Sequence, residues 1–379
     1  MVETIKNDSA LINNDELESV IIEIDQEPLD KDKNNYRHEI VFEGDAKEYF
    51  NIWIVNIALT ILTLGIFSAW AKVRKKRYFH GNTFLDGNSF EYTANPVSIL
   101  KGRLVAVVLF AIYWVAANFY PMALIPVAII AVLLLPWVIY RSLRFNALNS
   151  IYRGVRFGFD GKYKDAAKAY LFWPALFPFT LGLIWPYVQY KQNLMFVSQS
   201  RFGLGGFNFS AKGRDFYNIY FKLFIISLVF GFLAILGVML MTYLSSVLAS
   251  PSAEPGLYMV IVSVLTLLPM FIAQIYFYTY LQVRIRNLVF NNAIISNTRF
   301  KSTLDVSELF KIYLVNVIAI ILSLGLLAPW AAIRVARYKA ENTVVISERL
   351  LETMKASSAG GGNAMGEEVG DMFDVGVGI

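Results

Sequence analysis

Seven long runs of apolar residues divide this chain, and polar, mostly basic segments separate them. Two pairs of runs carry almost no charge, 104–119 with 122–140 and 223–247 with 258–281. Each run approaches the roughly 20 residues that an α-helix needs to cross a bilayer core. Short turn-forming connections join the runs within each pair, so the pattern predicts two transmembrane hairpins.

The other three runs, 49–70, 170–187 and 309–330, share a pattern of their own. Each contains a Leu-Gly step with a hydroxyl residue just before it, an aromatic residue five positions after the glycine and a cation nine positions after it. The members are Thr63, Gly65, Trp70 and Arg74; Thr180, Gly182, Tyr187 and Lys191; and Ser323, Gly325, Trp330 and Arg334. Asn56 and Asn316 both stand nine positions before the glycine. These fixed offsets predict an internal repeat over about 42–87, 156–204 and 299–347.

Short segments that alternate apolar and polar residues stand before several helices, at 41–44, 89–92, 156–159, 206–209 and 299–300. Asp86-Gly87 is a favourable hairpin turn. We therefore expect a small cytoplasmic β-layer beside an otherwise all-α polytopic membrane domain at 37–351. Acidic and glycine-rich tails at 1–36 and 352–379 are predicted to be disordered.

Composition agrees with a membrane protein, because 56% of residues are hydrophobic, 17% are charged and the mean hydropathy is +0.49. The chain has no cysteine, and its two histidines, His38 and His80, have no partner at metal-ligand spacing. No phosphate-binding loop, nucleophile motif or paired catalytic carboxylate appears, so we expect no enzyme activity, metal or cofactor. Basic residues are dispersed between the apolar runs, which argues against nucleic-acid binding.

Two topologies account for the seven runs. If all of them cross the membrane, three loops conflict with the tendency of basic loops to face the cytoplasm. If each repeated run instead bends at its glycine and returns, every basic loop and both termini lie in the cytoplasm. Irregular backbone at depth is tolerable where protein covers it. We favour the re-entrant hairpins, while spanning helices stay possible.

The segments 48–56, 62–74 and 77–87, including Leu-Thr-Leu-Gly-Ile-Phe-Ser-Ala-Trp before Ala71, strongly resemble the YjgN-like family of bacterial inner-membrane proteins. The resemblance covers about residues 38–347 and leaves out both tails. It implies a location in the bacterial inner membrane. It implies no activity, because the function of that family is unknown.

Two groups of residues are candidates for function. The bends and nearby amides could hold an ion or substrate, as broken helices do in transporters, or could serve only close helix packing. This group comprises Asn56, Thr63, Gly65, Thr180, Gly182, Asn316, Ser323 and Gly325. The cations could bind anionic lipid headgroups or could only anchor the topology. That group comprises Lys72, Arg74, Lys75, Lys76, Arg77, Lys191 and Arg334.

These patterns support two functional hypotheses. The first is passage of a small solute, ion or lipid through a cavity between the repeats and the hairpins. The second is a non-transporting scaffold or lipid-binding protein that uses a basic cytoplasmic rim. The sequence does not indicate an oligomeric state.

Overall fold

The computed structural model describes residues 36–248 and 255–347, and the described residues from Arg37 onward fall in one compact unit. Ten strands are present among them: β1 Tyr36–Phe42, β2 Thr83–Leu85, β3 Asn88–Tyr92, β4 Ser150–Tyr152, β5 Val155–Phe159, β6 Ser200–Phe202, β7 Gly205–Phe209, β8 Ala293–Ile295, β9 Thr298–Ser302 and β10 Thr343–Ser347. The main helices are α2 Ala46–Leu62, α3 Ser68–Gly81, α4 Pro96–Phe119, α5 Leu124–Leu148, α8 Trp185–Gln199, α9 Gly213–Leu248, α10 Pro255–Asn291, α11 Val306–Leu322 and α12 Ala328–Glu341. Shorter helical pieces are η1 Pro121–Ala123, α6 Tyr163–Ala167, η2 Lys168–Phe172, α7 Trp173–Ala175 and η3 Pro178–Thr180.

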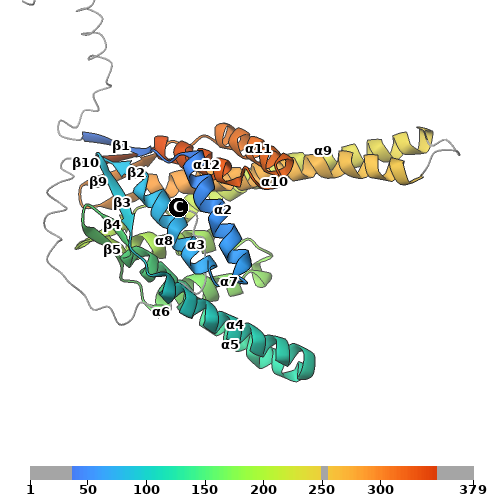
Figure 1. Cartoon of the computed structure of the whole chain (residues 1–379). Coiled ribbons are helices and arrows are strands. Elements are labelled where there is room, and N and C mark those ends of the chain that lie inside the picture. Colours follow the sequence, from blue (N-terminus) through green and yellow to red (C-terminus); the bar gives the residue numbers. More distant parts are fainter. Residues whose placement is uncertain (1–35, 249–254, 348–379) are drawn as a thin grey trace, which may run out of the picture. The chain divides into compact units, whose positions relative to one another are not determined.

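The strands close into one antiparallel barrel in the order β1–β10–β9–β8–β7–β6–β5–β4–β3–β2. Five helical hairpins connect strands that pair with each other: β1 with β2, β3 with β4, β5 with β6, β7 with β8 and β9 with β10. The chain therefore consists of five strand–hairpin–strand units. Figure 1 shows the strands gathered at one end of the compact unit, with α4–α5 and α9–α10 reaching farthest from them.

The expectation of an all-α protein with a small β-layer is wrong, because a closed ten-stranded barrel is present. The five extended segments predicted from the sequence do lie in β1, β3, β5, β7 and β9, apart from residues 43 and 44. The strands that leave the second helices were missed. Four of these returning strands have only three residues, and each begins one or two residues after its helix ends. A period of two cannot be recognised over so few positions.

One hydrogen bond recurs at the base of every unit. The backbone N–H just after the first strand donates to the carbonyl oxygen of the amide residue that ends the second helix. The five pairs are Glu43–Asn82 at 2.9 Å, Thr93–Asn149 at 2.9 Å, Asp160–Gln199 at 2.8 Å, Ser210–Asn292 at 3.0 Å and Thr303–Asn342 at 3.0 Å. Each bond joins the start of the first helix to the end of the second helix. Both ends of every hairpin therefore lie beside the barrel.

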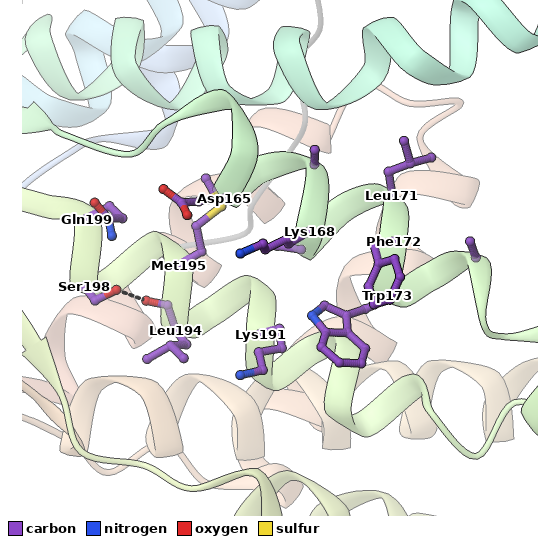
Figure 2. A pocket seen from close by; sticks show the side chains of 13 residues that line it. Asp165, Lys168, Leu171, Phe172, Trp173, Lys191, Leu194, Met195, Ser198 and Gln199 are labelled. Atoms are coloured by element: carbon purple, nitrogen blue, oxygen red, sulfur yellow. Dashed lines mark hydrogen bonds between the residues drawn. The ribbon is translucent and has the colours of Figure 1, made fainter.

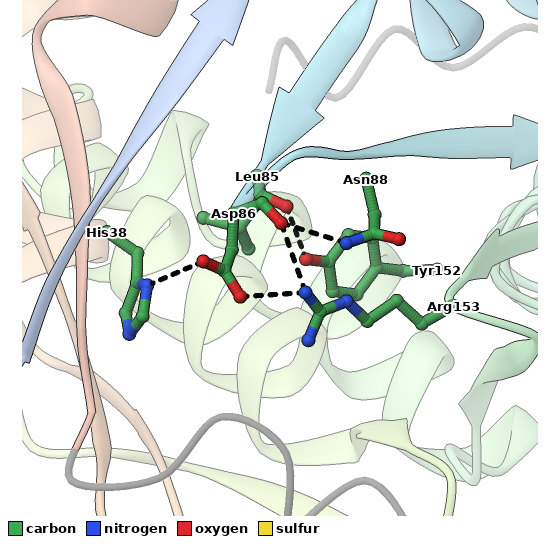
Figure 3. Close-up of polar contacts among 6 residues, drawn as sticks. All are labelled: His38, Leu85, Asp86, Asn88, Tyr152 and Arg153. Carbon is green, nitrogen blue, oxygen red and sulfur yellow. Dashed lines mark hydrogen bonds and ion pairs between the residues drawn. The ribbon is translucent and has the colours of Figure 1, made fainter. Parts of the chain in front are cut away.

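Apolar side chains fill the barrel. Leu85, Tyr152 and Val345 are buried there, with Phe90, Phe157, Phe202, Phe300 and Ile40 packed against them. The Tyr152 hydroxyl donates to the Leu85 carbonyl oxygen at 2.6 Å. Near the β2–β3 turn, the Asp86 carboxylate lies 2.7 Å from Arg153 Nη2 and 3.4 Å from His38 Nδ1 (Figure 3). This end of the barrel is therefore closed by packed rings and by a polar link between two turns.

The helices form a second, continuous ring. The second helix of each hairpin contacts the first helix of the next, through α3–α4, α5–α6, α8–α9 and α10–α11, and α12 contacts α2. Judged by length and composition, three helical segments within the described residues could cross a membrane: Pro96–Phe119, Leu124–Leu148 and Gly213–Leu240. The predicted disordered tails, apart from Tyr36 in β1, and residues 249–254 of the 248–257 connection lie outside the described residues.

Candidate functional site

The three predicted bends share one backbone conformation. Leu64, Leu181 and Leu324 have φ angles of 50°, 49° and 51°, and the glycines that follow have φ angles of 92°, 84° and 93°. In the first bend, Thr63 Oγ1 donates to the Leu59 carbonyl oxygen at 2.7 Å and accepts from the Phe67 N–H at 2.9 Å. These bonds satisfy the hydroxyl within the turn, and Ser323 and Thr180 also bond backbone carbonyls.

The bend leucines are exposed at the tips of their hairpins. Leu64, Leu181 and Leu324 are 95%, 92% and 94% exposed. A fully exposed leucine in water loses the free energy of burial, whereas hydrocarbon would solvate it. The bends therefore present apolar side chains outward, and their hydroxyls cap the backbone within each hairpin.

The two predicted asparagines hold cations of the same hairpin. Asn56 is 6% exposed and its Oδ1 accepts from Arg74 Nη1 at 3.3 Å. Asn316 is 4% exposed and its Oδ1 accepts from Arg334 Nη1 at 3.4 Å. Asn316 also donates to the Ala331 carbonyl oxygen at 3.3 Å. Each amide thus ties the first helix of its hairpin to the second.

The aromatic and the cation predicted for three hairpins occur in all five. In every unit a cation stands nine residues before the first residue of the returning strand, and an aromatic residue stands four residues before that cation. The five aromatic–cation pairs are Trp70–Arg74, Trp137–Arg141, Tyr187–Lys191, Tyr280–Arg284 and Trp330–Arg334. Residues four apart share one helix face. In the last four pairs the cation lies over the ring, at 5.6, 5.2, 5.7 and 4.7 Å from its centroid.

Arg141 and Arg284 were missed from the sequence because their hairpins have no Leu-Gly bend on which to align them. A second landmark was available. Asn149-Ser150 and Asn292-Ala293 repeat the amide and small residue that end the other hairpins, at Asn82-Thr83, Gln199-Ser200 and Asn342-Thr343. Alignment on this boundary brings out all five pairs.

The basic cluster on α3 is partly used in packing. Arg77 donates to the carbonyl oxygens of Tyr92 and Ala94 at 3.2 and 3.1 Å. Lys76 contacts Asn146 and lies 4.9 Å from the Tyr92 ring centroid. Lys75 is exposed and Lys72 half-buried. The predicted headgroup residues therefore do not form one surface, since two of them join α3 to the second unit.

Lys339 and Arg286 lie close together, and none of the ion pairs among the described residues joins either of them to a carboxylate. Lys339 Nζ donates to Gln282 Oε1 at 3.4 Å, and Tyr313 donates to the same oxygen at 3.3 Å. Burial and the nearby Arg286 charge lower the pKa of Lys339 to about 8. Burial also lowers the pKa of Arg286 to about 10, and its Nε and Nη1 form no hydrogen bond with any residue that the structure describes.

The third unit, between β5 and β6, contains an open groove of about 830 Å³ between η2 and α8. Figure 2 shows Lys168 from η2 and Lys191 from α8 between a polar group, Asp165, Ser198 and Gln199, and an apolar group, Leu171, Phe172 and Trp173. Gln192 Nε2 donates to the Ala169 carbonyl oxygen at 3.4 Å, which joins the two walls. None of the three bend glycines lines this groove.

A family model described as "Bacterial protein of unknown function (DUF898)" matches residues 37–372. Proteins named "Inner membrane protein YjgN" from Escherichia coli K12 and O157:H7 are 32% identical over 148 residues, which cover 39% of this chain and 37% of theirs. A protein of the same name from Salmonella typhimurium is 26% identical over 359 residues, covering 83% of this chain and 89% of its own. The aligned part thus spans little more than a third of the two Escherichia coli proteins. No solved structure matches the chain.

Proposed function

The chain belongs to the DUF898 family of bacterial proteins of unknown function, which confirms the resemblance to YjgN-like proteins, and we propose that it binds anionic phospholipid headgroups at the inner membrane. The observation that carries this proposal is the recurrence of one aromatic–cation pair in all five units. Aromatic rings and cations are the side chains that favour the boundary between hydrocarbon and water. A phosphate at this boundary would meet a cation in each unit.

The order of the units supports a shared surface. The helices contact one another in a closed ring, so the second helices that carry the five aromatic–cation pairs occur at regular positions around the barrel. A cation near an anionic membrane surface contributes about 1 kcal/mol of attraction. Five such cations would together favour anionic over zwitterionic lipid, as a binding protein or scaffold requires.

The hairpin lengths support a placement in the membrane. α2 and α11 have 17 residues each, or roughly 25 Å at 1.5 Å per residue, while α9 has 36 residues, or roughly 54 Å. A hydrocarbon core is about 30 Å thick. We propose that the two long hairpins cross it, that the three short hairpins enter partway with their leucine tips, and that the barrel and both chain ends lie in the cytoplasm.

Tags in 188–216 and in 248–257 test this placement. The first tag should be labelled only in inverted vesicles and the second only from outside intact cells. Labelling of 188–216 from outside would show that the second short hairpin crosses the membrane.

Passage of a solute stays a prediction that these observations support less. Thr63 and Ser323 are bonded within their bends, and apolar side chains fill the barrel. Transport requires a polar path. If it occurs beside the bends, replacing Gly65 and Gly325 with leucine should reduce flux of a small ion into liposomes while leaving lipid preference unchanged.

The binding proposal is tested by native mass spectrometry of the purified full chain titrated with dioleoylphosphatidylglycerol and dioleoylphosphatidylcholine. The double replacement Arg141→Gln and Arg284→Gln should lower the preference for the anionic lipid roughly thirtyfold, since two cations contribute about 1 kcal/mol each and about 1.4 kcal/mol is a factor of ten. The double replacement Arg141→Lys with Arg284→Lys should keep most of the preference for the anionic lipid, because it keeps both charges. Lys301→Gln on β9 is the matched control because it removes one exposed cation from the barrel. An unchanged preference in the double variant would contradict the proposal.

A further inference from the structure

The third unit departs from the first and fifth at the position of their buried asparagines. Asn56 and Asn316 stand eleven residues after the helix N-caps Asp45 and Asp305, and Trp173 stands eleven residues after the N-cap Lys162. Trp173 cannot accept a hydrogen bond through its side chain. Lys191 stands where the first and fifth units have an arginine. No asparagine side chain at position 173 therefore bonds it to the first half of its hairpin.

Lys191 lies instead among rings. Its Nζ is 5.2 Å from the Tyr187 centroid and 5.3 Å from the Tyr190 centroid. Trp173 packs edge-on against Tyr187 at 4.8 Å. Within the described residues, no ion pair joins Lys168 or Lys191 to a carboxylate. Two lysines thus line the groove with their positive charge available to a ligand.

The first half of this hairpin, from α6 to η3, is also irregular, which opens the groove. α2 and α11 are continuous helices, whereas the third unit has α6, the π-helix η2 and the three-residue α7. Pro174 has no N–H to donate to the carbonyl four residues earlier, so the α-helical ladder cannot continue through it. The Trp173 N–H bonds the Lys168 carbonyl oxygen instead, five residues back. Such π-turns are frequent at functional sites.

The lining changes from polar to apolar along the groove. The polar side chains, Asp165, Ser198 and Gln199, lie at the end near the barrel with Leu194 and Met195 beside them, the two lysines lie in the middle, and Leu171, Phe172 and Trp173 lie toward the bend (Figure 2). A ligand that matches this order has a polar group, an anion and an apolar chain in sequence. A glycerophospholipid has that order, with its phosphate between a polar headgroup and an acyl chain.

We propose that the groove between η2 and α8 is a specific site for one anionic glycerophospholipid, with its phosphate between Lys168 and Lys191 and an acyl chain along Leu171 and Trp173. This site rests on the proposed function and gives it a defined ligand. Charge complementarity selects the phosphate, and the apolar end requires a chain, so inorganic phosphate lacks half of the contacts. The expected stoichiometry is one tightly held lipid per chain.

The test uses variants outside the five aromatic–cation pairs. Lys168→Gln removes a phosphate contact, and Ala175→Trp fills the apolar end, since Ala175 also lines the groove. Each should weaken the tightest dioleoylphosphatidylglycerol site about tenfold in native mass spectrometry. Lys164→Gln is the matched control, because it removes an exposed lysine of the same half of the hairpin that does not line the groove. Circular dichroism and size-exclusion chromatography confirm that each variant is folded.

The outcomes separate the two proposals. If Lys168→Gln and Ala175→Trp leave the tightest site unchanged while Arg141→Gln with Arg284→Gln lowers the anionic preference, the groove is not the site and the general function stands. If none of these variants has an effect, both proposals fail. Inorganic phosphate competing as well as the lipid would overturn the amphiphile assignment, because the chain would then contribute nothing.

Discussion

Arg334 donates from Nη1 to Oδ1 of Asn316 at 3.4 Å across the fifth hairpin. The asparagine is almost fully buried, and its amide also donates to a carbonyl of the second helix. Arg334 in turn lies 4.7 Å above the Trp330 ring centroid. One buried amide therefore orients the cation and holds the two helices together, and the first hairpin repeats the contact between Arg74 and Asn56.

Replacing this amide should destabilise the hairpin. Asn316→Ala removes the buried amide that bonds Arg334 and the Ala331 carbonyl oxygen across the hairpin, so we expect the free energy of unfolding to fall by about 1–3 kcal/mol. Unfolding in mixed micelles, followed by circular dichroism, measures it. Asn51→Ala, at an exposed position of α2, should change stability little. Equal effects of the two substitutions would show that the buried bond adds no stability.

The link between two barrel turns gives a salt-dependent prediction. Asp86→Asn keeps a residue that tolerates the positive φ of 50° but weakens the 2.7 Å contact with Arg153, whose side chain is 16% exposed. We expect a loss of about 1 kcal/mol at low salt. Glu308→Gln, which removes the exposed pair with Lys311, should cost less. High salt should reduce the difference in free energy of unfolding between wild type and Asp86→Asn. If that difference does not change with salt, the contact between Asp86 and Arg153 is not stabilised by charge.

The sequence showed the helices well and the barrel poorly, for a physical reason. Long apolar runs such as 104–119, 223–247 and 258–281 depend only on composition, and the structure has helices there. Barrel closure depends on pairs such as β1 with β2, whose registered residues lie about 45 positions apart, as in Ile40 with Leu85. No local pattern encodes such a partner, and the three-residue strands carry too little periodicity.

The candidate residues divide in the same way. Asn56 and Asn316 were recognised as possible interhelical partners because they recur at a fixed offset, and the structure places them against arginines. The groove could not be anticipated, because it results from what the third unit lacks: an asparagine at Trp173 and an N–H at Pro174. A departure from a repeat becomes meaningful only once the geometry of the other copies is known.

Replacement by alanine should have different effects on stability at a bend glycine, Gly325, and at a helix glycine, Gly231. Gly325 has a φ of 93°, a conformation that L side chains rarely adopt, although a Cβ there would meet no atom within 4 Å. Gly325→Ala should therefore lower the free energy of unfolding by about 1–3 kcal/mol through backbone strain alone. Gly231→Ala lies in α9, where a Cβ is equally free of contacts, and should be neutral or stabilising by about 0.5–1 kcal/mol. Equal effects would exclude strain as the cause.

Lys339 makes stability depend on pH. Its pKa is lowered from the ordinary value of 10.5 to about 8, first by burial and then by the Arg286 charge. Below pH 8 both the folded and the unfolded chain carry the proton, so the folded state bears the full cost of a buried ammonium. Between pH 8 and 10.5 the unfolded chain binds more protons than the folded chain, so the free energy of unfolding must rise with pH, by roughly 3 kcal/mol at most from a shift of this size.

Lys339→Met should be more stable than wild type at pH 7. Its free energy of unfolding should also rise less between pH 7 and 10.5 when unfolding is followed in micelles. Lys311→Met removes an exposed lysine that is paired with Glu308, and this control should keep the wild-type rise. If Lys339→Met rises as steeply as wild type, other groups cause the pH dependence.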